Sequence, residues 1–466
     1  MKKTLKAILF FLVFSLGSTV TLYARIDSTK NATYDIRINT KDVKTKINDD
    51  FIGLSFELNI LTRHQNFLNK NNVQLVNLFK NLGKGVLRIG GGSSDLISWK
   101  NIYRDKNTPT NVITKTDIDN LKAFADAIGW KVLININIEK FDPNAAAQEA
   151  QYIVEKMGES LYGVQFGNEP DIYKNSSFEK YSANWSKYYD VVSKYTKKIA
   201  GPDVGSINKY FAPFAAKHAS QVFLLDAHYY QDGPASKDGI SMNTIINSSN
   251  KSSGYLGRMK SIASQYKRNY RISECNSIFG GGKANVSDAF GSALWGLNFM
   301  WDVAENNGAG VNFHCHYNLA YSAIGFDPKV NGQLIVHPLY YALLAFRQGA
   351  KGRLVSYNKP KNLNQLDVHA SIENNKCYIT IINKYPYDVT LALKFPEKVN
   401  NYQVNALSAP SLGEKTNTRF ANIRVSQNGA FSLKNINATS KSNVNSSTSV
   451  PLSVKKESAL IVICNL

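Results

Sequence analysis

The chain has 466 residues, of which 43% are hydrophobic and 19% are charged, and it carries a formal net charge of +20. This length is sufficient for two domains with a large buried core. Excess positive charge attracts anionic partners, but the lysines are scattered and form no arginine-rich stripe, so no nucleic-acid partner is expected. A solvated basic surface is the simpler interpretation of the charge.

Residues 1–24 have the pattern of a secretory signal peptide. Lys2, Lys3 and Lys6 precede an apolar run over residues 7–16, and the small residue Ala24 follows. The run is too short to span a membrane as a helix. We therefore expect a secreted or periplasmic protein without a membrane anchor.

Residues 25–50 contain one alternating segment, at 34–46, which begins Tyr-Asp-Ile-Arg-Ile-Asn-Thr. Alternation of apolar and polar residues predicts a half-buried β-strand. We expect this strand to join a sheet formed by the C-terminal region, with the central domain inserted between them. A disordered start of the mature chain is the alternative.

Residues 51–350 alternate short apolar strands with longer helical segments, which is typical of repeated β–α units. The strands are predicted at 52–56, 86–89, 132–136, 163–166, 204–206, 222–227, 270–273 and 310–313. Helices are predicted at 117–127, 143–157, 178–198 and 286–305, with Asp142 and Pro143 as N-cap and first residue of the second. Eight units predict an α/β fold, specifically a (β/α)8 TIM barrel.

Residues 351–466 change character, because short alternating segments are separated by Asn, Gly, Ser and Pro. Strands are predicted at 365–372, 377–383, 389–394, 402–407 and 459–463. This pattern indicates a C-terminal antiparallel β-sandwich. The Ser- and Asn-rich residues 439–449 are predicted to form a loop.

Four cysteines are present. Cys275 and Cys315 each follow a predicted barrel strand, and Cys377 and Cys464 lie in predicted C-terminal strands. An even number in a secreted chain permits disulfides between the members of each pair, and free buried thiols are equally compatible with the sequence. Their spacing does not match a zinc site, and we expect no metal and no cofactor.

Two glutamates follow predicted strands of the barrel. Glu169 comes after the fourth strand, in Gly-Asn-Glu-Pro-Asp, and Glu274 ends the seventh. Barrel enzymes carry their chemistry at the C-terminal ends of the strands, and strands four and seven lie nearly opposite each other. Asn-Glu-Pro alone is a weak signal, since these residues also mark turns. Two carboxylates facing one pocket, however, are the apparatus of glycoside hydrolysis.

Four segments resemble those of glycoside hydrolase family 79, the heparanase and β-glucuronidase family. In chain order they are residues 87–95 (second-strand Gly-Gly motif), 167–171 (acid/base motif), 228–230 (His-Tyr-Tyr) and 273–288 (nucleophile segment with a Gly-rich turn). The Gly-rich turn is the most specific of them. The resemblance implies a retaining hydrolase in which Glu169 is the acid/base and Glu274 is the nucleophile.

Neighbouring residues are assigned supporting roles in substrate binding. Asn168 is expected to donate a hydrogen bond to the sugar 2-hydroxyl. His228 and Tyr230 share one face of their strand, so both are expected to hydrogen-bond Glu274. The alternative for His228 is a satisfied core histidine.

A glycine turn is expected to point successive backbone N–H groups towards an anion. It consists of Gly280, Gly281 and Gly282. In the family that the chain resembles, such glycines bind the uronic-acid carboxylate. The alternative is a flexible loop that leads into the next helix. Glu57 and Asp95, near the ends of the first two strands, are assigned to the hydroxyls at the far end of the sugar, with ordinary rim polarity as the alternative.

The sequence departs from the family at two positions. Tyrosines that donate to the uronate carboxylate are often found before the glycines and on strand eight, where this chain has Phe279 and Phe313. Phenylalanine cannot donate a hydrogen bond. Tyr317 is the first candidate to replace them. The other candidates are His314, His316 and Lys283.

Three functions are therefore weighed. The first is a secreted retaining β-glycosidase that cleaves β-linked glucuronic acid or a related uronate from a carbohydrate, through a covalent glycosyl-enzyme at Glu274. The second acts on a neutral sugar such as xylose or glucose, which Phe279 and Phe313 favour. The third is a non-catalytic glycan-binding protein, and it ranks lowest because both carboxylates are present.

Overall fold

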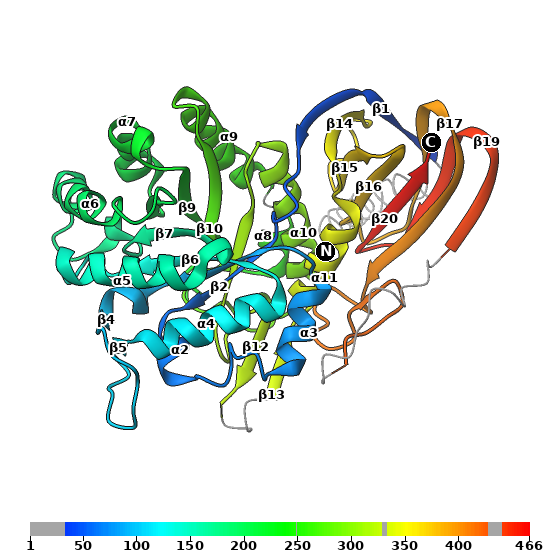
Figure 1. Cartoon of the computed structure of the whole chain (residues 1–466). Helices are drawn as coiled ribbons and strands as arrows, with labels where there is room; N and C mark the ends of the chain where they lie inside the picture. The colour runs from blue at the N-terminus through cyan, green and yellow to red at the C-terminus, as the bar shows by residue number, and fades with distance from the viewer. Residues whose placement is uncertain (1–32, 248, 329–332, 427–439) are drawn as a thin grey trace, which may run out of the picture.

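The computed structural model describes residues 33–247, 249–328, 333–426 and 440–466, in two domains that lie side by side (Figure 1). One is a barrel covered by helices and the other is a β-sheet domain. The segment interpreted as a signal peptide, residues 1–24, lies outside the described residues. Within the described part of the chain, the helices are all too short or too polar to cross a bilayer.

Eight parallel strands form the barrel, as the sequence predicted. They are β2 (Gly53–Glu57), β3 (Val86–Gly90), β6 (Lys131–Ile136), β7 (Leu161–Phe166), β8 (Ala200–Val204), β9 (Leu224–Asp232), β10 (Asn269–Ile278) and β11 (Val311–Cys315). β11 pairs with β2, and a single bridge between Val164 and Ile199 joins β7 to the start of β8. The sheet therefore closes on itself, and the C-terminal ends of all eight strands meet at one rim.

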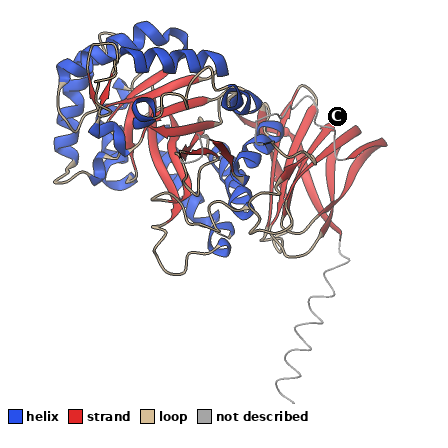
Figure 2. Cartoon of the chain, turned by 90° about the horizontal axis from the view of Figure 1, so that it is seen from below, coloured by secondary structure: helices blue, strands red, loops and turns tan. Residues whose placement is uncertain are grey.

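Helices surround this sheet (Figure 2). The longer ones are α3 (Val73–Asn81), α4 (Lys115–Ile128), α5 (Pro143–Met157), α6 (Phe178–Val192), α7 (Ala212–His218), α9 (Ser249–Gln265), α10 (Phe290–Glu305) and α11 (Pro338–Gly349). The short elements are α2 (Asn59–Arg63), α8 (Met242–Ile246), β4 (Ser98–Trp99), β5 (Val112–Ile113), β12 (Ile324–Asp327) and β13 (Gln333–Val336).

The helix ends follow local chemistry. α5 begins as predicted, with Asp142 accepting a hydrogen bond from the Ala145 amide at 3.0 Å. The helix predicted at 286–305 is α10, which begins four residues later than predicted. A turn precedes it, in which the Lys283 amide donates to the Ser287 hydroxyl at 3.0 Å. That turn carries the chain from the Gly-rich segment back to the outside of the barrel.

The second domain is one sheet of eight strands. They are β1 (Thr33–Lys46), β14 (Arg353–Asn358), β15 (Leu366–Glu373), β16 (Lys376–Asn383), β17 (Val389–Ser408), β18 (Arg419–Phe420), β19 (Ser440–Val454) and β20 (Ser458–Asn465). β1 runs antiparallel to β14 and parallel to β17, so the ladder returns to its starting strand around a separate apolar core. The N-terminal strand thus belongs to the C-terminal domain, as expected.

Two expectations for this domain are wrong. Residues 389–394 and 402–407 are parts of one continuous strand, β17. The segment at 439–449, predicted as a loop, forms most of β19 from residue 440 onward, and residue 439 lies outside the described residues. β19 pairs antiparallel with β17 from Val389 to Val404. A long partner strand supplies backbone hydrogen bonds on both sides of two irregularities in register, and this pairing overrides a composition rich in Ser and Asn.

The four cysteines are buried free thiols. Cys377 and Cys464 stand opposite each other on the antiparallel pair β16 and β20. The two domains meet where His369 of β15 stacks on Trp301 of α10, with ring planes 3° apart, and contacts Glu305 at 2.8 Å. This contact adds to an apolar junction, because Ile382, Leu407 and Ile461 of the sheet domain belong to the same buried cluster as the barrel core.

Candidate active site

The barrel interior is polar at its C-terminal end. Inward-facing side chains from six strands meet there: Arg88 (β3), Gln165 (β7), Asp203 (β8), His228 and Tyr230 (β9), Glu274 (β10) and His314 (β11). These side chains are joined by hydrogen bonds, so the end of the barrel is one connected network.

Glu274 is delivered by an irregularity in its strand. β10 advances by two residues between Ile272 and Glu274 while its partner β9 advances by one, from Ala227 to His228. Such a bulge re-aims side chains. As a result Ser273 and Glu274, although consecutive, both point into the barrel, where Ser273 donates to Asp203 at 2.7 Å.

The Glu274 carboxylate is surrounded by donors. Arg88 Nη1 donates to its Oε2 at 2.7 Å, the Tyr230 hydroxyl donates to its Oε1 at 2.8 Å, and His314 Nδ1 lies 3.5 Å away. Burial alone would raise the pKa of Glu274, but the charges of His314, His228 and Arg88 and the Tyr230 hydroxyl outweigh it and hold the pKa at about 2. This carboxylate is therefore ionised at any working pH.

Glu169 lies beyond the end of β7 on a left-handed turn, with φ 49° and ψ 53°. Its amide donates to the Asp203 carbonyl at 2.9 Å, which holds the turn in place. Its carboxylate contacts His228 Nδ1 at 2.9 Å, and its side chain is 25% exposed. Unlike Glu274, this carboxyl has one fixed polar neighbour and an open side.

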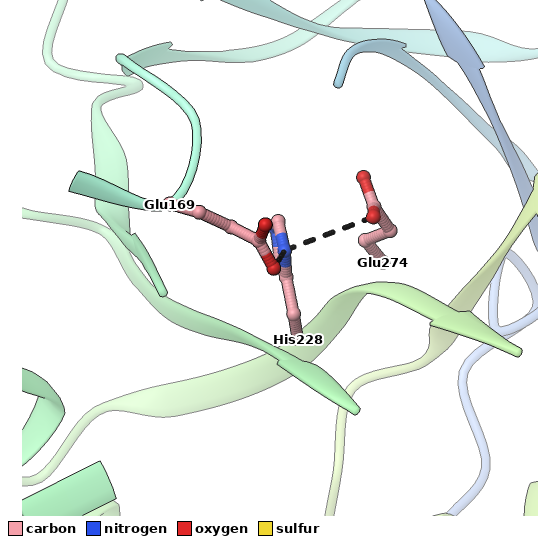
Figure 3. A group of neighbouring side chains, drawn as sticks. All are labelled: Glu169, His228 and Glu274. Carbon is pink, nitrogen blue, oxygen red and sulfur yellow. Dashed lines mark hydrogen bonds and ion pairs between the residues drawn. The ribbon is translucent and has the colours of Figure 1, made fainter. Parts of the chain in front are cut away.

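Figure 3 shows His228 between the two carboxylates, 2.9 Å from Glu169 and 3.9 Å from Glu274. One oxygen of each carboxylate and a nitrogen of His228 all lie within 4.8 Å of one another. The expectation that His228 hydrogen-bonds Glu274 is wrong, since its two nitrogens bind Glu169 and Asp203 instead. The expectation for Tyr230 agrees with the geometry.

Arg88 is one of the residues of this network that sequence reasoning missed. It is completely buried and donates to five side chains: Ser55 (2.9 Å), Gln165 (3.2 Å), Asn168 (2.8 Å), Asp203 (2.6 Å) and Glu274 (2.7 Å). The available signal was an arginine in the middle of an apolar strand, which requires buried partners. Asp203 was also missed, because the strand was predicted at 204–206, whereas β8 spans Ala200–Val204 and includes Asp203.

Asn168 is oriented from two directions. Its side-chain Oδ1 accepts a hydrogen bond from Arg88, and its backbone amide donates to Asp95 Oδ2 at 3.1 Å. Among the described residues, its Nδ2 has no acceptor and remains available for a ligand.

Asp95 lies behind the loop that carries Glu169 rather than on the open rim. It is 3% exposed, and burial raises its pKa to about 7, although hydrogen bonds from Tyr173 and the Asn168 amide act against this. The structure thus places Asp95 as a support for the Asn168 backbone and not at the surface where a sugar hydroxyl would reach it.

Glu57, by contrast, belongs to the network. It accepts from the Ser93 amide at 2.8 Å, and its Oε1 lies 3.5 Å from His314 Nε2. The other nitrogen of His314 faces Glu274, so this histidine links the two carboxylates. The side chain of Glu57 is 20% exposed and is open to a ligand.

Strand eight faces the site with His314, not with Phe313. The Phe313 ring is fully buried and packs against Trp295 and Phe299 of α10, outside the barrel. Its treatment as a substrate-facing position is wrong, because side chains alternate along a strand. Phe279 is 42% exposed and lies beside Tyr230, with ring centroids 6.3 Å apart.

Tyr317 does not replace the missing donors. It packs against His64 and Phe326, at ring distances of 5.0 and 5.7 Å. The tyrosine that faces the site from this loop is Tyr321, which lies 6.2 Å from the Tyr230 ring and 5.9 Å from the His314 ring. Sequence reasoning missed it, since its position depends on the course of the loop.

The glycine turn adopts the backbone that its composition requires. Gly280, Gly281 and Gly282 all have positive φ, at 77°, 99° and 87°. A side chain at Gly282 would meet the Tyr321 amide at 2.7 Å, so the turn packs directly on the Tyr321 loop. Lys283 extends away, and its ammonium group donates to the Ile240 carbonyl at 3.0 Å.

Glu169, His228 and Glu274 offer three ligand atoms close enough for one metal ion. Their environment does not favour one, because Glu274 already accepts from Arg88 and Tyr230 and faces His314. Buried cations on the same carboxylate compete with a metal for its charge. The arrangement is better suited to proton transfer and nucleophilic attack.

Comparisons with known proteins agree on the fold. No known family profile matches the chain. A curated β-glucuronidase from Aspergillus niger is 24% identical over 301 residues, 53% of this chain and 53% of that protein, so the chain spans about half the length of the relative it matches.

Solved structures match over nearly the whole chain. A 4-O-α-L-rhamnosyl-β-D-glucuronidase from Fusarium oxysporum has a TM-score of 0.76 at 16% identity and covers 91% of this chain and 99% of its own. A GH51 arabinofuranosidase from Xanthomonas axonopodis has a TM-score of 0.72 at 13% identity, with coverages of 93% and 99%. These likenesses show that the chain has the barrel-plus-sheet fold of glycoside hydrolases.

Proposed function

We propose that this protein is a retaining β-glycoside hydrolase in which Glu274 is the nucleophile and Glu169 is the acid/base. The observation that carries the proposal is the spacing of the two carboxylates, whose nearest oxygens lie within 4.8 Å. Retaining enzymes hold their carboxyl groups about 5–5.5 Å apart, whereas inverting enzymes need about 6.5–9.5 Å to admit a water. The short spacing supports a covalent glycosyl-enzyme.

The charges around the pair support the same division of roles. Burial would lower the pKa of His228, but Asp203 and Glu274 raise it well above its usual value. Burial would also lower the pKa of His314, but Glu274 and Glu57 raise it above its usual value. With Arg88 these make three cations, which face three ionised carboxylates on Asp203, Glu274 and Glu57. Glu169, the fourth carboxyl, shares a hydrogen bond with His228 and is open on its other side, so it is the carboxyl of this cluster that can exchange a proton.

The reaction then follows from the contacts. Glu169 protonates the glycosidic oxygen while Glu274 attacks the anomeric carbon, and a water activated by Glu169 later releases the sugar. Tyr230 and Arg88 hold Glu274 in line for attack, and the free Nδ2 of Asn168 donates to the sugar 2-hydroxyl.

We further propose a uronate as the natural glycone, in keeping with the resemblance to the heparanase and β-glucuronidase family. Two of the similar proteins described above are named as glucuronidases. In this chain the glycine turn lies against Tyr321, whose ring is near Tyr230. Among the described residues the amides of Gly280, Gly281 and Gly282 have no acceptor, so the turn and Tyr321 offer donors to a carboxylate.

A neutral glycone is the second candidate, because the uronate would be held by backbone amides and a tyrosine rather than by a free cation. The discriminating experiment compares aryl β-D-glucuronide, β-glucoside and β-xyloside with the purified protein. We expect a clear preference for the glucuronide, and Tyr321→Phe should reduce that activity more than any residual activity on the glucoside. Preference for a neutral sugar would retain the two glutamates but reject the uronate.

The mechanism is tested separately. Proton NMR of the first product should show the β-anomer before it equilibrates, and a 2-fluoro-glycosyl inhibitor should label Glu274, as identified by peptide mass spectrometry. An initial α-anomer would show inversion and reject the proposed roles.

We also propose that the protein is secreted or periplasmic, on the basis of the pattern in residues 1–24. N-terminal sequencing of the exported protein would test this. A mature chain that begins near residue 25 is the expected result.

A further inference from the structure

One buried carboxylate lies beneath both catalytic glutamates. Asp203 is fully buried and accepts hydrogen bonds from five side chains on five strands. They are Gln165 (2.7 Å), His228 (2.8 Å) and Ser273 (2.7 Å) at Oδ1, and Arg88 (2.6 Å) and Asn135 (2.9 Å) at Oδ2. It cannot touch a substrate, because these side chains separate it from the open part of the site.

Asp203 is placed there by a second bulge. β8 advances by two residues, from Pro202 to Val204, where β9 advances by one, from Asp226 to Ala227. Asp203 takes the extra position in a left-handed conformation, with φ 60°, and its amide donates to Asp226 at 2.8 Å. A strained backbone that is retained in a buried position indicates a functional constraint.

Two arms lead from Asp203 to the reacting groups. One runs through Arg88, which contacts both Asn168 and Glu274. The other runs through His228, whose Nε2 contacts Asp203 and whose Nδ1 contacts Glu169. In addition, the Asp203 carbonyl accepts from the Glu169 amide.

The chemistry of the second arm is specific. An ionised carboxylate only accepts, so Asp203 keeps a proton on His228 Nε2. The hydrogen bond between Nδ1 and Glu169 then holds one further proton, which can lie on either partner. This is the proton that Glu169 gives to the leaving group and recovers from water.

We propose that Asp203 is the positioning residue of this enzyme, fixing the protonation of His228 for proton transfer at Glu169 and, through Arg88, the aim of Glu274. This inference rests on the proposed glycosidase activity and extends it to a residue outside the substrate pocket. Several charged or titratable groups interact with the Asp203–His228 pair from the surrounding elements: Arg88, Asp95, Glu169, Asp171, Tyr181, Asp226 and Glu274.

Asp226 provides a matched control. It is equally buried and lies on the neighbouring strand, and its side chain accepts hydrogen bonds from Gln165 and the Asp203 amide, the two that it forms within the described part of the chain. Burial and the nearby Asp203 raise its pKa to about 8, whereas Arg88 and His228 overcome burial and keep the pKa of Asp203 well below its usual value. The substitution Asp226→Asn therefore replaces a neutral side chain by a similar neutral one, whereas Asp203→Asn removes a negative charge.

The test compares Asp203→Asn with Asp226→Asn. For Asp203→Asn we expect kcat on an aryl glycoside to fall roughly 10²-fold and the alkaline limb of the pH profile to move to lower pH. Asp226→Asn should keep kcat within about threefold and leave the profile unchanged. The proposal would be overturned if the two substitutions had equal effects on kcat. It would also be overturned if Asp203→Asn folded and the alkaline limb of its pH profile stayed where it is in the wild type.

Two further measurements keep the test decisive. Nitrogen-15 NMR of the His228 ring reports its protonation without turnover, so a shift in Asp203→Asn would support the positioning role even if the proposed activity failed. If Asp203→Asn does not fold, Ser273→Ala removes one donor and leaves a more basic carboxylate. The alkaline limb of the pH profile should then move to higher pH. If it did not move, the positioning role of Asp203 would again be rejected.

Discussion

The two glutamates of the site are held in opposite ways. Glu274 lies within a strand, has a side chain that is 8% exposed and is contacted by an arginine, a tyrosine and a histidine. Glu169 lies on a turn beyond a strand, is 25% exposed along its side chain and has one histidine partner. A carboxylate that must stay ionised is enclosed by fixed donors, whereas one that exchanges a proton has a titratable partner and access to water.

The largest effect should come from the enclosed carboxylate. Glu274→Gln removes the nucleophile while keeping the size of the side chain, so kcat on an aryl β-D-glucuronide should fall on the order of 10⁵-fold. Circular dichroism should confirm that the variant is folded. A loss of less than tenfold would show that Glu274 is not the nucleophile.

Glu169→Ala should produce a loss that depends on the leaving group. A poor leaving group needs the proton, so turnover of alkyl glycosides should fall about 10³-fold, and that of a dinitrophenyl glycoside about tenfold. Azide should restore turnover by occupying the space of the missing carboxylate and attacking the glycosyl-enzyme. Equal losses on both kinds of substrate would contradict the acid role.

Arg88→Lys keeps a positive charge but loses the planar fork that reaches Asn168, Asp203 and Glu274 together. We expect kcat to fall about 10²-fold. Arg271 is the matched control, because it is equally buried but donates to Asn312 and to backbone carbonyls such as those of Phe51 and Val311. Arg271→Lys should lower the melting temperature and leave kcat within about threefold.

Tyr230→Phe removes one of the hydrogen bonds to Glu274 and should cost about tenfold in kcat, the equivalent of about 1.4 kcal/mol. Tyr229 on the same strand faces Tyr255 and Phe299 instead. Tyr229→Phe should therefore leave kcat unchanged. If both substitutions have the same effect, the Tyr230 hydroxyl does not act on Glu274.

The smallest effect on turnover is expected for Asp95→Asn, which changes the pH dependence of stability. Asp95 has a pKa of about 7 in the folded protein, against 3.8 as the ordinary value, because it is buried. Between about pH 4 and pH 7 the unfolded chain has lost this proton and the folded chain keeps it, so the contribution of Asp95 to the free energy of unfolding falls as pH rises. Melting temperatures at pH 4.5 and pH 7.5 should show the variant gaining stability relative to wild type at the higher pH.

The barrel could be predicted from the sequence because each buried strand is a short apolar run between helical segments. Every predicted strand overlaps or adjoins an observed one, including 204–206, which meets β8 only at Val204. Strand ends then pointed to Glu169 and Glu274, because they follow two of these runs.

The sequence could not show what depends on neighbouring strands. The bulges at Asp203 and Glu274 are irregularities of pairing, so they leave no periodic signal in one strand. The partners of Arg88 and His228 come from other strands of the closed barrel, and the position of Tyr321 depends on the path of its loop. The same holds for β19, whose backbone pairs with β17 from Val389↔Val454 to Val404↔Ser440, far apart in the sequence.

The pairing of β1 with β14 and β17 has a consequence for synthesis of the protein. The strand ends at Lys46, and its first partner begins at Arg353, roughly 300 residues later. At about 5–20 residues per second, a ribosome needs roughly 15–60 s to make that interval. During this time β1 exposes unpaired backbone groups, while the barrel can fold beside it. We therefore expect the sheet domain to assemble after the barrel, with β1 open to aggregation or chaperone binding until its partners are made.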